Sequence, residues 1–109
     1  MTDNSKFSKM SEDAKKIRLK YPNKCPIIII NKDPMLEVEK TKFLVPNDIT
    51  ISEFIHYVRK YVKNLKPSQA IFIFIKDEIP VMSSLVSSPK YFNDDGFVYV
   101  YVKSESVFG

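Results

Sequence analysis

The sequence has 109 residues, of which 44% are hydrophobic and 28% are charged. This length and composition are typical of one globular domain with its own core. With only two glycines, one cysteine and one histidine, the chain cannot form a glycine-rich phosphate loop, an intrachain disulfide or a zinc site of histidine and cysteine. Its longest apolar runs have six residues, far fewer than the roughly 18 of a membrane span. The polar N-terminus predicts a cytosolic protein.

The positive charge is concentrated at one end of the chain. The net charge is +4, and residues 1–24 carry seven basic and three acidic side chains, whereas residues 25–109 carry ten of each. A basic end on a neutral body favours an anionic partner, such as an acidic peptide, an acidic lipid or a nucleic acid. A solvated helix face would give the same pattern, so charge alone leaves both interpretations open.

The first part of the chain predicts one helix and two strands. We expect residues 1–9 to be loosely ordered and Ser11 to cap a helix that Pro22 ends. The β-branched run Ile27–Ile30 predicts a strand that is buried on both faces. Thr41–Val45 predicts a second strand, which we expect to pair with the first as a hairpin across a loop of about ten residues.

The second part predicts a longer helix and two more strands. Residues 50–53 have the Thr-x-x-Glu spacing of a capping box. Apolar residues then recur with a 3.6-residue period, which predicts a helix over residues 51–65. Residues 70–75 predict a buried strand, residues 83–89 one helical turn, and residues 97–103 the last strand.

This order of elements predicts the fold class. A hairpin followed by a helix that crosses back to the sheet is the β-grasp arrangement, and the right-handed crossover rule permits a four-stranded mixed sheet with one helix across a face. We therefore predict a single α+β domain over residues 1–109. It consists of an N-terminal helical extension (1–24), a β-grasp core (25–103) and a tail (104–109).

No group of residues indicates an enzyme. His56 has no serine or cysteine nucleophile beside it in the sequence, which favours an ordinary surface or structural histidine. Cys25 lies at a predicted strand start, and without a base or an oxyanion site it is best interpreted as a small buried hydrophobe. The acid pairs at 77–78 and 94–95 fall in predicted turns, which is typical of turn formers and not of a magnesium site.

The predicted strand Thr41–Val45 has the features of an edge strand. It is short, Lys40 and Lys42 flank its start, and Pro46 follows it. An edge strand can accept an extended peptide as an added strand, and lysines beside it would favour an acidic peptide. The alternative is that the lysines only protect the edge from aggregation.

The tail has a chemical property of its own. Residues 107–109 are Val-Phe-Gly, and a glycine carboxylate can enter a narrow channel and reach a catalytic cysteine because glycine has no Cβ. Ubiquitin-type tails are activated in this way. A single glycine is a weak signal, which the predicted β-grasp core strengthens.

Four segments carry motifs that occur together in one known family. They are KKIRLKYPNKCPIIII (15–30), TKFLVPNDITISEF (41–54), AIFIFIKDEIP (70–80) and GFVYVYVKSESVFG (96–109). In this order they resemble the autophagy-related protein eight family, which includes the GABARAP-like ubiquitin-like modifiers. The resemblance runs from about Phe7 to Gly109.

The resemblance implies a ubiquitin-like modifier of autophagy with a ubiquitin-like β-grasp fold, no catalytic activity and no cofactor. Gly109 would be the conjugation residue: an E1-like enzyme adenylates it, an E2-like enzyme carries it as a thioester, and it ends as an amide on phosphatidylethanolamine. A cysteine protease usually trims residues after the glycine and releases the lipid-linked form. Whether Gly109 is encoded last or exposed by trimming stays open. The protein would be cytoplasmic, and on the autophagosome membrane once lipidated.

The resemblance also implies a surface that binds cargo receptors and adaptors through short acidic motifs with an aromatic residue and, three residues on, an aliphatic residue. The positions that match the aromatic pocket are Asp13, Ile17, Pro26, Ile28, Lys42, Leu44 and Phe97. The positions that match the aliphatic pocket are Phe43, Val45, Pro46, Ile49, Phe54, Tyr57 and Val58. The candidates for contacts with the acidic flank are Lys24, Lys40 and Arg59. For each apolar residue, packing in the core is the alternative.

The chain departs from the family at its N-terminus, where the first of two family helices is expected to be a stub around Phe7–Met10. Other functions stay open: a modifier joined to a protein lysine, an unconjugated peptide-binding adaptor, or a basic domain that binds RNA through its sheet. Because the sequence lacks the aromatic-glycine pattern of RNA-recognition motifs, we expect no nucleic-acid partner.

Overall fold

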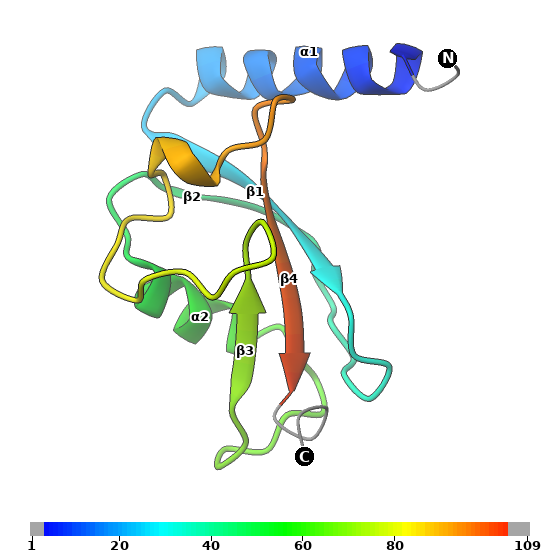
Figure 1. Cartoon of the computed structure of the whole chain (residues 1–109), viewed down its shortest axis with the longest axis vertical. Coiled ribbons are helices and arrows are strands. Elements are labelled where there is room, and N and C mark those ends of the chain that lie inside the picture. Colours follow the sequence, from blue (N-terminus) through cyan, green and yellow to red (C-terminus); the bar gives the residue numbers. More distant parts are fainter. Residues whose placement is uncertain (1–3, 105–109) are drawn as a thin grey trace.

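A computed structural model of the chain describes residues 4–104, with side chains from residue 12 onward (Figure 1). The elements in chain order are α1 (Asn4–Lys20), β1 (Lys24–Asn31), β2 (Lys42–Pro46), α2 (Ile51–Arg59), β3 (Ile71–Phe74), the 3-10 turn η1 (Pro89–Tyr91) and β4 (Val98–Ser104). The predicted order of elements is confirmed. None of the described helices is long and apolar enough to cross a membrane.

The four strands form one mixed sheet in the order β2-β1-β4-β3. The two central strands, β1 and β4, are parallel, and each outer strand is antiparallel to its neighbour. The predicted β1–β2 hairpin is confirmed, and β2 is an edge strand as expected. Figure 1 shows α1 crossing the end of the sheet at which β4 begins.

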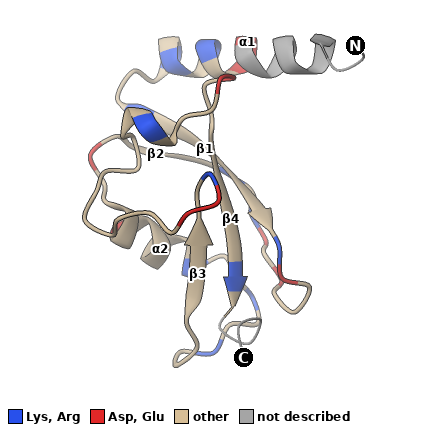
Figure 2. Cartoon of the chain, in the orientation of Figure 1, with Lys and Arg blue, Asp and Glu red and all other residues tan. Residues whose placement is uncertain are grey.

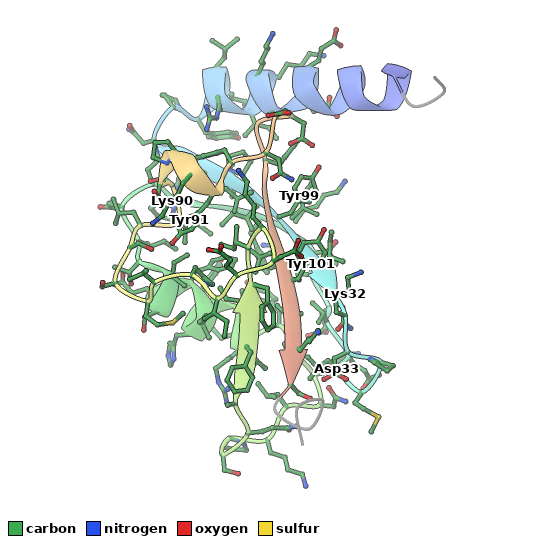
Figure 3. The ribbon with its side chains drawn as sticks, viewed as in Figure 1. Lys32, Asp33, Lys90, Tyr91, Tyr99 and Tyr101 are labelled. Atoms are coloured by element: carbon green, nitrogen blue, oxygen red, sulfur yellow. The ribbon has the colours of Figure 1, made fainter. Side chains whose placement is uncertain are left out.

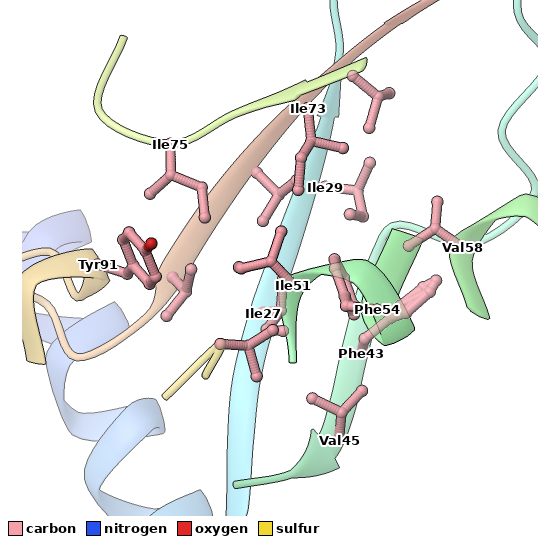
Figure 4. Packing of buried hydrophobic residues seen from close by; sticks show 14 of the residues in the cluster. Ile27, Ile29, Phe43, Val45, Ile51, Phe54, Val58, Ile73, Ile75 and Tyr91 are labelled. Atoms are coloured by element: carbon pink, nitrogen blue, oxygen red, sulfur yellow. The ribbon is translucent and has the colours of Figure 1, made fainter. Parts of the chain in front are cut away.

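The core lies between the sheet and α2. Ile51, Phe54 and Val58 of α2 are buried in one cluster with Ile27 and Ile29 of β1 (Figure 4). The ring of Phe54 also meets that of Phe43 edge to face, with the ring centroids 5.9 Å apart, a favoured geometry for aromatic pairs.

The prediction that β1 is buried on both faces was wrong. Ile27 and Ile29 are buried, but Ile28 and Ile30 are only half-buried. The face that carries Ile27 and Ile29 packs against α2. On the other face, α1 contacts β1 and Pro26 is buried. The contact with α1 does not extend along the whole strand, so Ile28 and Ile30 stay partly accessible to solvent.

α1 is longer than the sequence suggested. It runs without a break from Asn4 to Lys20, so Ser11 lies inside the helix and does not cap it. The expectation of a loosely ordered start was wrong for residues 4–9, and the separate stub around Phe7–Met10 is part of this one helix. The reason is visible in the sequence, since residues 4–20 contain no proline or glycine to stop the helix.

α2 begins as predicted and ends early. The capping box is present: the backbone N–H of Glu53 donates to Thr50 Oγ1 (3.1 Å), and that of Thr50 donates to Glu53 Oε1 (2.8 Å). The helix ends at Arg59 instead of residue 65, because the following backbone bonds to the 37–39 segment. The N–H of Lys63 donates to the Glu37 carbonyl at 2.9 Å.

The helical turn predicted at residues 83–89 is displaced to η1, where Pro89 occupies the first helical position.

Cys25 is a buried core residue, as predicted. Burial raises the pKa of its thiol to about 12, against a smaller lowering effect of Arg18. We expect iodoacetamide to label Cys25 at pH 7.5 only when the protein unfolds. The thiolate is the reactive species, and in the folded chain the thiol stays protonated and the reagent cannot reach it. Intact-mass spectra recorded with and without 6 M guanidinium chloride check this. Rapid labelling of the folded protein would contradict the assignment.

Two buried carboxylates, Asp95 and Asp33, hold the two ends of β4. Figure 3 shows Asp33 beside the end of the strand. Near its start, Asp95 accepts hydrogen bonds from the N–H of Phe97 (3.0 Å) and from the Tyr99 hydroxyl. At its end, Asp33 accepts bonds from the N–H (2.8 Å) and the hydroxyl of Ser104. Asp95 belongs to an acid pair that we expected in a turn, and the burial of Asp95 and of Asp33 was not predicted.

The bonds to Asp33 make folding stability depend on pH. Burial alone would raise the pKa of this carboxyl, but hydrogen bonds from Ser104 and Met35, with the nearby charge of Lys103, lower it below its usual value. The unfolded chain therefore binds the proton more tightly. The stabilisation is complete above about pH 4, the unfolded pKa, and is lost as the pH falls through the folded pKa.

We expect Asp33→Asn to lower the free energy of unfolding by about 2 kcal/mol at pH 7. The difference from the unsubstituted protein should shrink below about pH 4, where the carboxyl of Asp33 begins to bind a proton in the unfolded chain while it is still ionised in the folded one. Urea unfolding at pH 7, 4 and 3 measures this. A difference that stays constant over that range would show that the charge of Asp33 contributes nothing.

Candidate functional site

A cavity of ≈ 850 Å³ opens between α1, β1 and β2, and we call it the α1–β2 cavity. Its lining comes from four places in the sequence: α1, β1, the β2 region and the residue before β4. The lining residues are Asp13, Lys16, Ile17, Pro26, Ile27, Ile28, Lys40, Lys42, Phe43, Leu44 and Phe97. All seven positions that the resemblance assigned to the aromatic pocket are among them.

Strand register explains why the floor of this cavity is apolar. Pro26 of β1 lies directly across from Leu44 of β2, and Ile28 lies across from Lys42. Side chains two residues apart point to the same face of a sheet. These four side chains therefore share one face, and Ile17 of α1 closes the cavity beside them.

The rim of the cavity is basic. Lys16, Lys40 and Lys42 line it, against the single acid Asp13, and Figure 2 shows further basic residues along the described part of α1. An apolar floor with a positive rim fits a ligand that has an apolar side chain and neighbouring carboxylates. Lys16 was missed in the sequence, although its position three residues after Asp13 places both on one helix face.

The backbone of β2 offers hydrogen bonds beside the cavity. The N–H of Ile29 donates to the Thr41 carbonyl at 2.7 Å. Pairing in an antiparallel ladder alternates, so Phe43 and Val45 bond to β1 while the N–H and C=O groups of Lys42 and Leu44 point outward. Since β2 is the edge of the described sheet, these groups can pair with an added strand.

The positions assigned to the aliphatic pocket behave differently. Phe43, Val45, Phe54 and Val58 are buried in the core. Ile49 and Tyr57 are half-buried and packed against that core, and Pro46 is exposed. The Phe43 ring meets Tyr57 at 5.7 Å and Tyr61 at 5.3 Å, both edge to face. Of this set, only Phe43 lines the α1–β2 cavity, and for the four buried residues the structure supports the alternative of core packing.

The three candidates for an acidic flank lie in different places. Lys40 lines the α1–β2 cavity, and its ammonium lies over the rings of Phe43 (4.9 Å) and Tyr61 (5.1 Å). Lys24 lines a separate cavity of ≈ 380 Å³ beside Arg18.

Arg59 has a structural role in the loop that follows α2. Its guanidinium donates to the carbonyls of Gln69 (2.7 Å), Pro67 (3.3 Å) and Lys66 (3.4 Å). These bonds hold the loop against the helix end and occupy the guanidinium that the resemblance assigned to the acidic flank, so its contact with a peptide stays a prediction.

The tail and the cavity belong to opposite ends of β4. Phe97, just before the strand, lines the cavity, whereas Ser104 ends the strand. Seven residues of extended chain separate these ends by roughly 20 Å. Gly109 itself lies outside the described residues. Among the described residues, no group of histidine, cysteine and acidic side chains is arranged to hold a metal ion.

Comparison with known proteins decides the family. The family model described as "Autophagy protein Atg8 ubiquitin like" matches residues 9–109. The chain belongs to the Atg8 family. It is 36% identical to Autophagy-related protein 8 of Schizosaccharomyces pombe over 111 residues, which covers 98% of this chain and 91% of that protein. The same protein of Coccidioides immitis is 37% identical, with 98% and 94% covered.

The structural comparison agrees. The crystal structure of Trypanosoma brucei ATG8 superimposes with a TM-score of 0.82 at 32% identity, and the match covers 91% of this chain and 88% of that one. The predicted resemblance and the ubiquitin-like α+β fold are therefore confirmed. This Atg8-family chain is an autophagy-related ubiquitin-like protein, and its family is one of modifiers and not of catalysts.

Proposed function

We propose that this Atg8-family protein is conjugated through Gly109 to phosphatidylethanolamine, and that it recruits receptors to the autophagosome membrane through the α1–β2 cavity. One observation carries the second half of the proposal: residues from four separate segments, selected by family resemblance, line a single apolar cavity with a basic rim. The family match through Gly109 supports the first half.

Peptide binding would combine two kinds of contact. An extended peptide adds as a strand to the outward backbone groups of Lys42 and Leu44. An aromatic side chain of the peptide fills the cavity over Ile28 and Leu44, and flanking carboxylates lie near the rim lysines. A single motif of this kind is expected to bind with a Kd of about 1 μM, or roughly −8 kcal/mol.

Conjugation requires enzymes that this chain does not contain. The Gly109 carboxylate attacks the α-phosphate of ATP on the E1-like enzyme, which releases pyrophosphate and leaves an acyl adenylate. A cysteine thiolate displaces AMP, the thioester passes to the E2-like enzyme, and the lipid amine displaces the thiolate to form the amide. A cysteine protease would hydrolyse that amide again.

The geometry supports both activities in one molecule. Because the cavity and the end of β4 are roughly 20 Å apart, a lipid on the tail leaves the cavity accessible. Two acyl chains would give stable anchoring, since each buried CH₂ contributes about 0.8 kcal/mol. Many copies on one membrane would then bind clustered receptors more tightly through effective concentration.

The test is reconstitution with E1-like and E2-like enzymes, ATP and phosphatidylethanolamine liposomes, with intact mass as the measurement. We expect a lipid-sized mass gain that Gly109→Ala prevents, because the alanine Cβ obstructs the narrow channel. No gain, with the enzymes active on another substrate, would disprove lipid conjugation. A gain on a lysine-containing protein instead would favour a protein-targeted modifier, and no adduct at all would leave an unconjugated adaptor.

A further inference from the structure

β4 continues past the end of its parallel neighbour. The register between β1 and β4 runs from Ile27 opposite Val98 to Asn31 opposite Val102, and β1 then ends while β4 extends to Ser104. The N–H of Lys32 still donates to the Val102 carbonyl at 3.0 Å. On the β1 side, the sheet has no further strand for the last two residues of β4.

The carboxylate of Asp33 takes the place of that missing strand. Asn31 lies opposite Val102 in the β1–β4 register, so the same register continued by two residues would place Asp33 opposite Ser104. At this position the side chain of Asp33 accepts the hydrogen bond that the backbone of a longer β1 would accept. Its Oδ2 accepts the Ser104 N–H at 2.8 Å and also the Ser104 hydroxyl. Asp33 is only 1% exposed, so these bonds form away from water, where charged hydrogen bonds are strong.

The turn that holds Asp33 is itself braced. Its other oxygen, Oδ1, accepts the N–H of Met35 at 2.9 Å, and the N–H of Asp33 donates to Asn31 Oδ1 at 2.9 Å. Asn31 Nδ2 donates to the Leu36 carbonyl at 3.0 Å. The position of Ser104 is thus tied to a loop 71 residues earlier in the chain.

The place of Ser104 determines what the tail can reach. Five residues follow it, from Glu105 to Gly109, and fully extended they span about 17 Å. β3 holds this end of β4 on the other side, where Ile71 pairs with Ser104 and Phe72 with Lys103, so without Asp33 only one side of Ser104 stays paired. If the end of β4 then frayed to Val102, about 7 Å of additional chain would have to be oriented at each encounter. Orientation of the reacting groups is a large part of catalysis.

We propose that Asp33 is a positioning residue for conjugation: by fixing Ser104, it sets the point from which Gly109 enters the active sites of the E1-like and E2-like enzymes. This inference rests on the proposed function. Asp33 acts through Ser104 and touches none of the reacting atoms.

The chain offers a matched control in Asp95. Both carboxylates are buried, both bond to a backbone N–H and a hydroxyl of the β4 region, and they hold opposite ends of one strand. Asp33→Ala and Asp95→Ala therefore each remove one backbone and one hydroxyl bond to β4 or its start, and Asp33→Ala also removes the bond from the Met35 N–H within its own turn. Only Asp33 lies at the start of the tail. Circular dichroism and urea unfolding establish a temperature at which both variants are folded.

The first measurement is the rate of thioester formation on the E2-like enzyme at saturating and at limiting concentrations of the variant. We expect Asp33→Ala to lower kcat about tenfold or more and Asp95→Ala to leave it near the value of the unsubstituted protein. Ser104→Ala removes the hydroxyl bond to Asp33 and keeps the backbone bond, so it should lower kcat less than Asp33→Ala does. Its effect should not add to that of Asp33→Ala, because that variant already lacks the bond. The second measurement is hydrogen exchange of the Ser104 amide, which should lose protection in Asp33→Ala and keep it in Asp95→Ala.

Equal kcat values for the two aspartate variants would overturn the inference, because a merely structural role affects both. Unchanged exchange at Ser104 in Asp33→Ala would overturn it as well. These outcomes leave the proposed function intact if the unsubstituted protein is conjugated. If the unsubstituted protein forms no thioester with enzymes active on another substrate, the proposed function fails, and the positioning role with it.

Discussion

Leu44→Asp is expected to weaken the binding of an acidic, tryptophan-containing peptide at least thirtyfold, or by about 2 kcal/mol. Leu44 lines the α1–β2 cavity from the edge strand and is 37% exposed, so it offers apolar surface to a ligand. The substitution removes that surface and places a negative charge beside the carboxylates of the peptide. Its backbone still offers the same strand pairing, which isolates the side-chain contribution.

The protein contains no tryptophan, so the fluorescence of the peptide's own tryptophan reports binding directly. Leu19→Asp is the matched control: Leu19 is 84% exposed on α1 and is not among the residues that line the cavity. It should bind the peptide with affinity close to that of the unsubstituted protein, and urea unfolding should be nearly unchanged in both variants. Equal affinities for the two variants would mean that the peptide binds elsewhere.

Phe54→Ala is expected to have the largest effect on stability, a loss of about 3–5 kcal/mol in the free energy of unfolding. Phe54 is 0% exposed, lies in the core cluster and packs edge to face on Phe43. Truncation leaves a cavity that the surrounding side chains fill only partly. The free energy of unfolding of a domain of this size is about 5–15 kcal/mol in total, so the variant should unfold at a much lower urea concentration.

Phe72→Ala on β3 provides the comparison, since it makes the same chemical change at a side chain that is partly exposed. We expect Phe72→Ala to lower the free energy of unfolding clearly less than Phe54→Ala does, by about 1–2 kcal/mol. Equilibrium urea unfolding, followed by circular dichroism, gives both values. Equal losses for the two variants would show that Phe54 is not the centre of the core.

The candidate site illustrates what can be found without coordinates. Lys42 and Leu44 were assigned to one pocket by family resemblance, and the register of β2 against β1 places them on one face of the sheet. The same reasoning did not distinguish Phe43 and Val45, which lie in the core, because an apolar residue in a strand looks the same whether it faces a ligand or α2. The structural role of Arg59 could not be predicted for a related reason, since its carbonyl partners lie in a later loop.

The local sequence by itself determined the features that depend on neighbours in the chain: the order of elements, the capping box at Thr50 and the charged character of the edge strand. Such features need only short-range hydrogen bonds and periodicity. Tertiary structure alone decided where α2 stops, which face of β1 is covered, and that Asp33 is buried against Ser104. Each of these depends on partners that are distant in the sequence, and a carboxylate remains charged in a core only when the fold brings donors to it.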